Sequence, residues 1–347
     1  MSLQFIIGSS GIGKTHYACE QIIRESMENP QHLYYIIVPE QFTMQTQKNV
    51  VEMHPGKGIL NIDVLSFQRL AYRIFEETGG AREVLLDDTG KSMVLQKLVQ
   101  QHRKNLPYLG SQMNKPGYLD EVKSLISEFM QYDIREEELQ DMLGKTGEDS
   151  LLHMKMQDVG VLYQAFLQYL EGHYMTGEGV MDALKKAIPF SDKLKKSVLL
   201  LDGFTGFTPV QMNVIRELLA VCDQVLVTVT MDAKENPLQM GKPHQLFYMS
   251  RKMIHTLSGL TNDLDDPVYL KEEKKGRFSD APALGFLEQH LFRYRKAAYG
   301  KSQDEIRIFA AESPIKELEE TARRIRRMVR EEDLKYGEIA VITGNLE

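Results

Sequence analysis

The stretch Gly8-Ser9-Ser10-Gly11-Ile12-Gly13-Lys14-Thr15 decides the fold. It fits the pattern G-x-x-x-x-G-K-[ST], in which the glycines let backbone N–H groups converge on a phosphate. Lys14 is expected to reach the β- and γ-phosphates of a nucleotide, and Thr15 to place its hydroxyl on Mg²⁺. The stretch therefore predicts a P-loop that binds ATP and Mg²⁺. The alternative is a glycine-rich turn without a ligand.

The residues on either side of this stretch support the prediction. Residues 3–7 are mostly apolar and predict a short buried strand. Residues 15–27 predict a helix with Ala18, Ile22 and Ile23 on one face. A bound anion would then lie at the N-terminus of a helix, where the dipole and the free N–H groups stabilise negative charge.

Strands and helices alternate through the rest of residues 1–85. Buried strands are predicted over 33–38 and 62–65, and helices over 44–51 and 66–78, the second one ending at Gly79-Gly80. Nearly continuous apolar strands joined by helices are typical of a parallel sheet that is covered on both faces. The expected fold class is therefore α/β.

Helical periodicity replaces this alternation over residues 86–196, which predict an all-helical insertion. The α/β pattern resumes over 197–300. A buried strand covers 197–201 and ends in Asp202, a helix opens at Pro209, and another strand covers 224–230. The polar stretch 261–280 predicts a loop.

Residues 301–347 predict one further strand–helix–strand unit. Strands are expected over 305–310 and 338–343, and Ser313-Pro314 is expected to open a helix that runs to about residue 330. The chain stops four residues after the second of these strands. We therefore expect a truncated second α/β domain, and the chain to be a fragment of a longer protein.

The bulk composition narrows the class of protein. The chain has 347 residues, of which 42% are hydrophobic and 26% charged, as in ordinary globular proteins. No apolar run approaches the roughly 20 residues that span a bilayer, and no signal peptide is present, so we expect a cytoplasmic protein without a membrane partner. Cys19 and Cys222 lack metal-ligand spacing. The net charge of −7 argues against coating DNA by bulk charge, but it permits a local basic groove.

The dipeptide Asp202-Gly203 bears on ATP hydrolysis. A P-loop NTPase needs an acid at the end of a second strand to hold Mg²⁺, and Asp202 is in that position. The next residue in helicase-type ATPases is a glutamate that acts as a base, whereas here it is Gly203. A missing base costs about 10²–10⁴-fold in rate. We therefore expect ATP to be bound but poorly hydrolysed, and we assign no catalytic residue. Asp202 as a simple strand-end cap is the alternative.

Three more stretches share their order along the chain with a known family. They are Val38-Pro39-Glu40-Gln41-Phe42-Thr43, Leu65-Ser66-Phe67-Gln68-Arg69-Leu70-Ala71-Tyr72 and Leu201-Asp202-Gly203-Phe204-Thr205-Gly206-Phe207-Thr208-Pro209-Val210-Gln211. With the P-loop, they resemble the N-terminal, helicase-like region of AddB, one of the two proteins of bacterial AddAB helicase–nucleases. Active UvrD-like helicases carry D-E-x-Q-D where this chain has Asp202-Gly203. The resemblance implies a helicase fold whose motor has lapsed.

The resemblance also implies a domain layout and DNA contacts. It implies a superfamily 1-like P-loop core (1A), a 1B-like insertion over 86–196 and the start of a 2A domain over 301–347. Loops that read the Chi sequence in the 3′-terminated single strand match a set of six residues here. They are Gln41, Thr43, Phe67, Arg69, Tyr72 and Phe207. Alternatively, Phe67 and Tyr72 are core aromatics, and the polar residues of the set are caps or surface groups.

The family further implies an AddA-type partner subunit, DNA ends as substrate, and a C-terminal nuclease domain with an iron–sulfur cluster outside this chain. No metal other than Mg²⁺ with the nucleotide is expected here. Three rival readings stay open: an active, DNA-stimulated superfamily 1 ATPase, a small-molecule P-loop kinase, and a scaffold that no longer binds nucleotide. The long helical insertion argues against the kinase.

Overall fold

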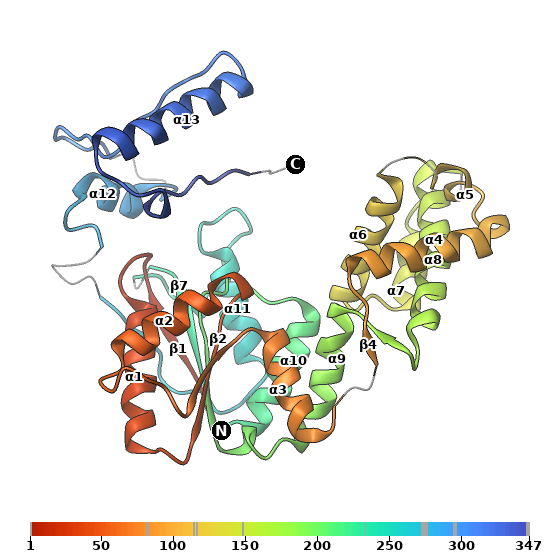
Figure 1. Ribbon diagram of the computed structural model, residues 1–347, viewed down its shortest axis with the longest axis horizontal. Helices are drawn as coiled ribbons and strands as arrows, with labels where there is room; N and C mark the ends of the chain where they lie inside the picture. Colours follow the sequence, from red (N-terminus) through yellow and green to blue (C-terminus); the bar gives the residue numbers. More distant parts are fainter. Residues whose placement is uncertain are drawn as a thin grey trace. The chain divides into compact units, whose positions relative to one another are not determined.

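A parallel sheet of six strands forms the centre of the computed structural model (Figure 1). Its order is β3-β2-β6-β7-β1-β8. The strands are β1 (Ser2–Gly8), β2 (Leu33–Ile37), β3 (Ile62–Leu65), β6 (Ser197–Leu201), β7 (Gln224–Thr230) and β8 (Val268–Tyr269). All neighbouring pairs in this sheet run parallel. The predicted α/β fold class is confirmed.

The structure describes residues 2–80, 83–113, 115, 117–147, 149–232, 234–271, 277–293 and 297–344. The chain divides into two units, Met1–Arg277 and Phe278–Glu347, each of which is described by itself. The sheet belongs to the first unit. The expected division near residue 300 falls inside the second unit.

Helices cover both faces of the sheet. On one face lie α1 (Lys14–Glu28) and α2 (Thr43–Met53). On the other face lie α3 (Phe67–Thr78), α9 (Gly177–Ala187), α10 (Pro209–Val221) and α11 (Tyr248–Ser258). Along β2, Tyr34 and Ile36 belong to the first core, and Tyr35 and Ile37 to the second. The apolar strands are thus continuous because both of their faces are buried.

The predicted helical insertion is confirmed and has a hydrophobic core of its own. It contains α4 (Asp88–His102), α5 (Leu109–Gln112), α6 (Tyr118–Gln131), α7 (Glu136–Gly144) and α8 (Leu151–Leu170). A two-stranded parallel ribbon of β4 (Val84–Leu85) and β5 (Tyr174–Met175) stands at its base. Each of these strands has two residues, which is too short for a period-2 pattern to predict.

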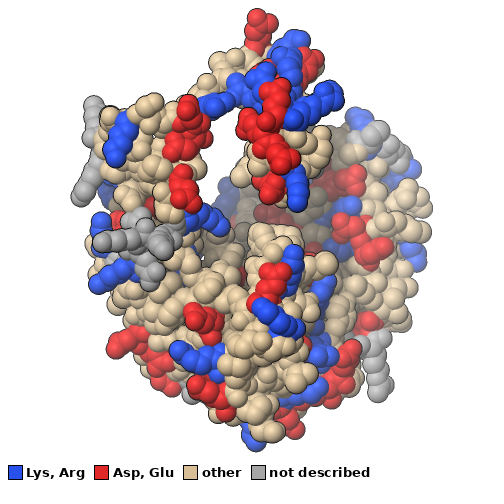
Figure 2. Space-filling model, turned by 60° about the vertical axis from the view of Figure 1, so that its left-hand side comes forward, with Lys and Arg blue, Asp and Glu red and all other residues tan. Residues whose placement is uncertain are grey.

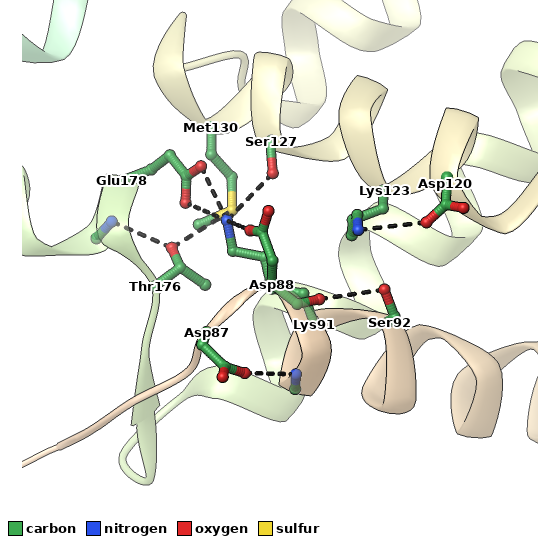
Figure 3. A network of polar contacts seen from close by, with 12 residues as sticks. Asp87, Asp88, Lys91, Ser92, Asp120, Lys123, Ser127, Met130, Thr176 and Glu178 are labelled. Atoms are coloured by element: carbon green, nitrogen blue, oxygen red, sulfur yellow. Dashed lines mark hydrogen bonds and ion pairs between the residues drawn. The ribbon is translucent and has the colours of Figure 1, made fainter. Parts of the chain in front are cut away.

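A buried ion pair joins the insertion to the helix that follows it (Figure 3). Lys91 Nζ on α4 lies 3.0 Å from both carboxylate oxygens of Glu178 on α9, and 3.3 Å from Ser127 Oγ on α6. The side chains of Lys91 and Glu178 are 8% and 10% exposed. Because α9 packs in the core of the sheet, this pair ties three helices to the body of the first unit.

The second unit contains α12 (Pro282–His290) and α13 (Pro314–Glu331). As predicted, Ser313 caps α13: its hydroxyl accepts a hydrogen bond from the N–H of Lys316. The strands predicted over 305–310 and 338–343 are wrong, since neither segment is paired among the described residues. A strand forms only where a neighbour completes its hydrogen bonds, and Ile308 and Ile342 are over 90% exposed here.

The prediction of a loop over 261–280 is also partly wrong. Residues 272–276 lie outside the described residues, but β8 lies within the stretch and pairs with β1. An additional bridge joins Leu3 to Leu264. The polar composition of the stretch conceals this short edge strand, whose pairing is supplied by β1. The helices α11 and α12 were not predicted from the sequence.

Candidate nucleotide and nucleic-acid site

All predicted site residues lie at one edge of the sheet. Since the strands are parallel, their carboxyl ends meet at the same edge, where open α/β sheets bind ligands. The P-loop follows β1, and Asp202 and Phe207 follow β6. Gln41 and Thr43 follow β2. Residues 67–72 begin the helix after β3.

The backbone of the P-loop takes a conformation that depends on its glycines. A Cβ at Gly8 would lie 2.7 Å from Cγ2 of Ile12, so no side chain fits there without a shift. Gly11 and Gly13 have φ angles of 76° and 95°, in the left-handed region that glycine adopts readily. Lys14 begins α1, and its Nζ donates to the carbonyl oxygen of Ser9 at 2.8 Å. The loop therefore forms a turn at a helix N-terminus.

Asp202 links the P-loop to two strands of the sheet. The Thr15 hydroxyl lies 3.0 and 2.9 Å from the two carboxylate oxygens of Asp202. The Thr228 hydroxyl, on β7 between β1 and β6, donates to Asp202 Oδ1 at 2.6 Å. Asp202 is 6% exposed. Thr228 was missed from the sequence, where the only signal is a hydroxyl within an apolar strand.

This donor set suits a nucleotide with Mg²⁺. A hydroxyl and a carboxylate within 3 Å of each other are hard oxygen ligands, which Mg²⁺ prefers together with phosphate oxygens and water. Within the described residues, no group of three or more His, Cys, Asp or Glu side chains could hold a metal by itself. Thr15 and Asp202 are therefore the residues that would hold a nucleotide-bound cation.

Neither cysteine contributes a thiolate to this site. Burial raises the pKa of Cys19 to about 12, and the Asp202 carboxylate adds to that increase. Burial likewise raises the pKa of Cys222 to about 12. Both thiols are thus protonated at neutral pH, and they pack as small apolar side chains in the two cores.

The residue after Asp202 is held in a conformation that disfavours a side chain. Gly203 has a φ of 78°, and its N–H donates to the Thr228 hydroxyl at 3.4 Å. A Cβ there would contact only Pro39 Cδ, at 3.7 Å, so the constraint is the backbone angle rather than space. Further along, Gln211 accepts a hydrogen bond from the N–H of Thr208 and forms the capping box of α10. The polar side chain that resembles a helicase motif residue has a structural role here.

Two of the candidate DNA-contact residues lie in the interior. Phe67 is 5% exposed, and its ring centroid is 5.7 Å from Phe204 and 6.3 Å from Phe207. Thr43 is 2% exposed, and its hydroxyl donates to the carbonyl oxygen of Glu40 at 2.9 Å. Phe67 packs as a core aromatic and Thr43 as a local cap. Phe207 is partly buried in the same aromatic cluster.

The other candidates lie at the surface. Gln41 is exposed, and Tyr72 is 39% exposed. Arg69 Nε lies 3.0 Å from Oε1 of Glu40, and both side chains of this pair are about half exposed. Phe42, which the sequence did not single out, is 50% exposed in the same turn. Its only sequence signal is an aromatic residue inside the stretch 38–43.

Charges of both signs are interspersed on the face shown in Figure 2, in keeping with the small net charge of −7. Many of the basic side chains are paired. Examples on α3 and α13 are Arg73 with Asp63 and Arg323 with Glu320. Paired charges of this kind leave little field to attract a phosphate backbone over a distance.

Comparisons with known proteins identify the family. The model of the family described as "ADDB, N-terminal" matches residues 5–288. This chain belongs to the AddB N-terminal family. A relative from Lachnoclostridium phytofermentans, named as the second (B) component of an ATP-dependent helicase/deoxyribonuclease, is 42% identical over 354 aligned residues, which cover 100% of this chain and 31% of the relative. Relatives of the same name from Thermoanaerobacter sp. and Clostridium acetobutylicum are 31% and 32% identical and are covered to 30%.

The chain thus spans about a third of the length of the curated relatives that it matches. The family match includes the whole candidate site, from the P-loop to the Asp202 loop. Among the described residues, no helix is both long and apolar enough to cross a bilayer.

Proposed function

We propose that this chain is the part of an AddB-type helicase–deoxyribonuclease component that holds and inspects single-stranded DNA, with ATP bound at the P-loop and hydrolysed poorly. One observation carries the proposal. Asp202 is hydrogen-bonded to Thr15 of the P-loop, as a Mg²⁺ site requires, yet the next residue is a glycine with a φ of 78°. The residues that bind phosphate and Mg²⁺ are retained, while the residue that would activate water is missing.

The proposal includes the rest of the protein. In it, residues 86–196 are a 1B-like subdomain beside a 1A-like core, and residues 301–347 begin a 2A-like domain. The intact protein works with an AddA-type subunit in the cytoplasm, processes DNA ends for recombinational repair, and reads Chi in the 3′-terminated strand. Its nuclease activity and iron–sulfur cluster belong to the part of the protein beyond this chain. The names of the relatives support ATP use and membership of a multi-subunit DNA enzyme.

Nucleotide binding is tested by titrating the chain with a fluorescent ATP analogue and Mg²⁺. We expect saturable binding by the wild type and loss of binding in Lys14→Ala, which removes the cation at the β- and γ-phosphates. Lys48→Ala is a matched control, since Lys48 is an exposed lysine on α2 paired with Glu52. A wild type that does not bind would support a scaffold without nucleotide.

Hydrolysis is tested separately by phosphate release in the presence of single-stranded DNA. We expect no release above background for the wild type. Release that DNA stimulates and that Lys14→Ala abolishes would show an active motor and would overturn the proposal.

A further inference from the structure

The aromatic side chains at the carboxyl edge of the sheet differ in accessibility. Phe67 is 5% exposed and is covered by Phe204 and Phe207. Phe42 and Tyr72 are 50% and 39% exposed. Stacking on a base needs an open ring face. Phe42 and Tyr72 therefore offer such a face, and Phe67 does not.

The turn that carries Phe42 is joined to α3 by an ion pair. This turn, η1 (Glu40–Phe42), is a single 3₁₀ turn directly after β2. Its first residue, Glu40, holds Arg69 Nε at 3.0 Å. Tyr72 follows Arg69 by three residues on α3, so the two side chains are neighbours on one side of the helix. Phe42, Arg69 and Tyr72 thus belong to one connected surface.

This surface is close to neutral in charge. Arg69 is paired with Glu40, and one helical turn later Arg73 is paired with Asp63 at 2.9 Å. Surfaces that bind the phosphate backbone present lysines and arginines that replace counterions. A paired arginine between accessible aromatic rings suits contact with bases instead. Glu40 engages Nε–H, which is one of five N–H groups of the guanidinium.

We propose that Glu40, Phe42, Arg69 and Tyr72 form a neutral surface that contacts the bases of single-stranded DNA, with Phe42 as a stacking face and Glu40 as a positioning residue for Arg69. The inference rests on the proposed DNA-binding function and adds to it how the strand is contacted. Phe42 stacks on any base, whereas Arg69 can donate to base edges and so discriminate among them. The burial of Phe67 leaves it the role of supporting this surface from below.

The first experiment measures binding of the full 347-residue chain to a fluorescein-labelled, mixed-sequence single strand by fluorescence anisotropy. Phe42→Ala and Phe42→Leu are expected to bind at least about five-fold more weakly, since both lose the stacking face, and Phe42→Trp is expected to keep the affinity. Phe190→Ala is the matched control. Phe190 is 76% exposed but precedes β6 at the opposite edge of the sheet, so its loss is expected to change nothing.

The second experiment repeats the titration at several salt concentrations. Glu40→Gln leaves Arg69 as an uncompensated cation, and the slope of log K against log salt is expected to steepen by about 0.7, the value for one phosphate contact on a single strand. A residue with only a structural role would not change this slope. In the wild-type background, Arg69→Ala is expected to weaken binding without flattening the slope.

The outcomes separate this inference from the proposed function. Wild-type binding that Phe42→Ala leaves intact, or an Arg69→Ala slope flattened by one contact, would overturn the base-contacting surface alone. Failure of the wild type to bind single strands would overturn both. Weakened binding of Phe42→Ala and Phe42→Leu, with Phe42→Trp and Phe190→Ala unchanged, supports the inference.

Discussion

The ion pair between Lys91 and Glu178 is expected to be the main polar link between the insertion and the sheet. Its side chains are 8% and 10% exposed, and Lys91 Nζ lies 3.0 Å from both carboxylate oxygens. Lys91→Met keeps a long apolar side chain but removes the positive charge. The Glu178 carboxylate then stays buried without its cation. Removing one partner of a buried pair destabilises a protein by about 3–5 kcal/mol.

The double variant Lys91→Met with Glu178→Met is expected to behave differently from either single variant. With both charges gone, no charge remains to be desolvated, and a well-packed apolar pair is often as stable as the ion pair or more so. The double variant should therefore recover most of the loss. The two substitutions should couple by at least about 3 kcal/mol in a double-mutant cycle.

Hydrogen exchange followed by mass spectrometry measures this effect locally. A loss of about 3–5 kcal/mol corresponds to exchange that is about 10²- to 10³-fold faster. We expect it in peptides from α4, α6 and α9 and not in peptides from β1 and β7. Lys123→Met is the control, because Lys123 pairs with Asp120, whose side chain is 71% exposed, and such pairs contribute about 0–1 kcal/mol. Equal exchange in Lys91→Met and Lys123→Met would refute the reasoning.

Three further predictions concern the site and the insertion. Gly203→Ala should lower the free energy of unfolding by about 1–2 kcal/mol in urea titrations because of its φ of 78°, while Gly144→Ala, at an unconstrained position, should not. Thr228→Val should cost about 1.5–3 kcal/mol by removing a hydrogen bond to the Asp202 carboxylate, and an unchanged midpoint relative to the exposed control Thr230→Val would contradict this. Burial, and then the Asp133 carboxylate, raise the pKa of Asp182 above its usual 3.8, so folding loses stability as the pH rises through the raised pKa. Asp182→Asn should therefore raise the melting temperature at neutral pH, with a difference that vanishes below about pH 3.8, where both states are protonated; a difference independent of pH would count against burial as its cause.

The sequence predicted the parallel sheet and the P-loop because their signals are local. Five of the six strands of the sheet are apolar runs bounded by turns, and the P-loop is one continuous motif. The meeting of Asp202 with Thr15 follows from two strand ends at the same edge. Thr228 was beyond reach, since its role depends on β7 lying between β1 and β6, and strand order is not written in any one segment.

The candidate DNA contacts show a second limit of the sequence. Phe42 and Phe67 are both aromatic residues just after strands, and nothing in the pattern tells which one is buried. The difference comes from Phe204 and Phe207, which lie far along the chain and cover Phe67 but not Phe42. The strands expected over 305–310 and 338–343 failed for the related reason that apolar alternation does not supply a partner strand.

The place of β1 in the sheet has a consequence for synthesis of the chain. β1 ends at Gly8, but its neighbours are β7, which starts at Gln224, and β8, which starts at Val268. At about 5–20 residues per second, the first strand therefore waits roughly 10–45 s for its partner to leave the ribosome. During that time an apolar strand with two unpaired edges is exposed to other chains, as expected for a fold of high contact order. The nucleotide site can therefore assemble only late in translation, and the nascent N-terminus is the segment on which a chaperone would act.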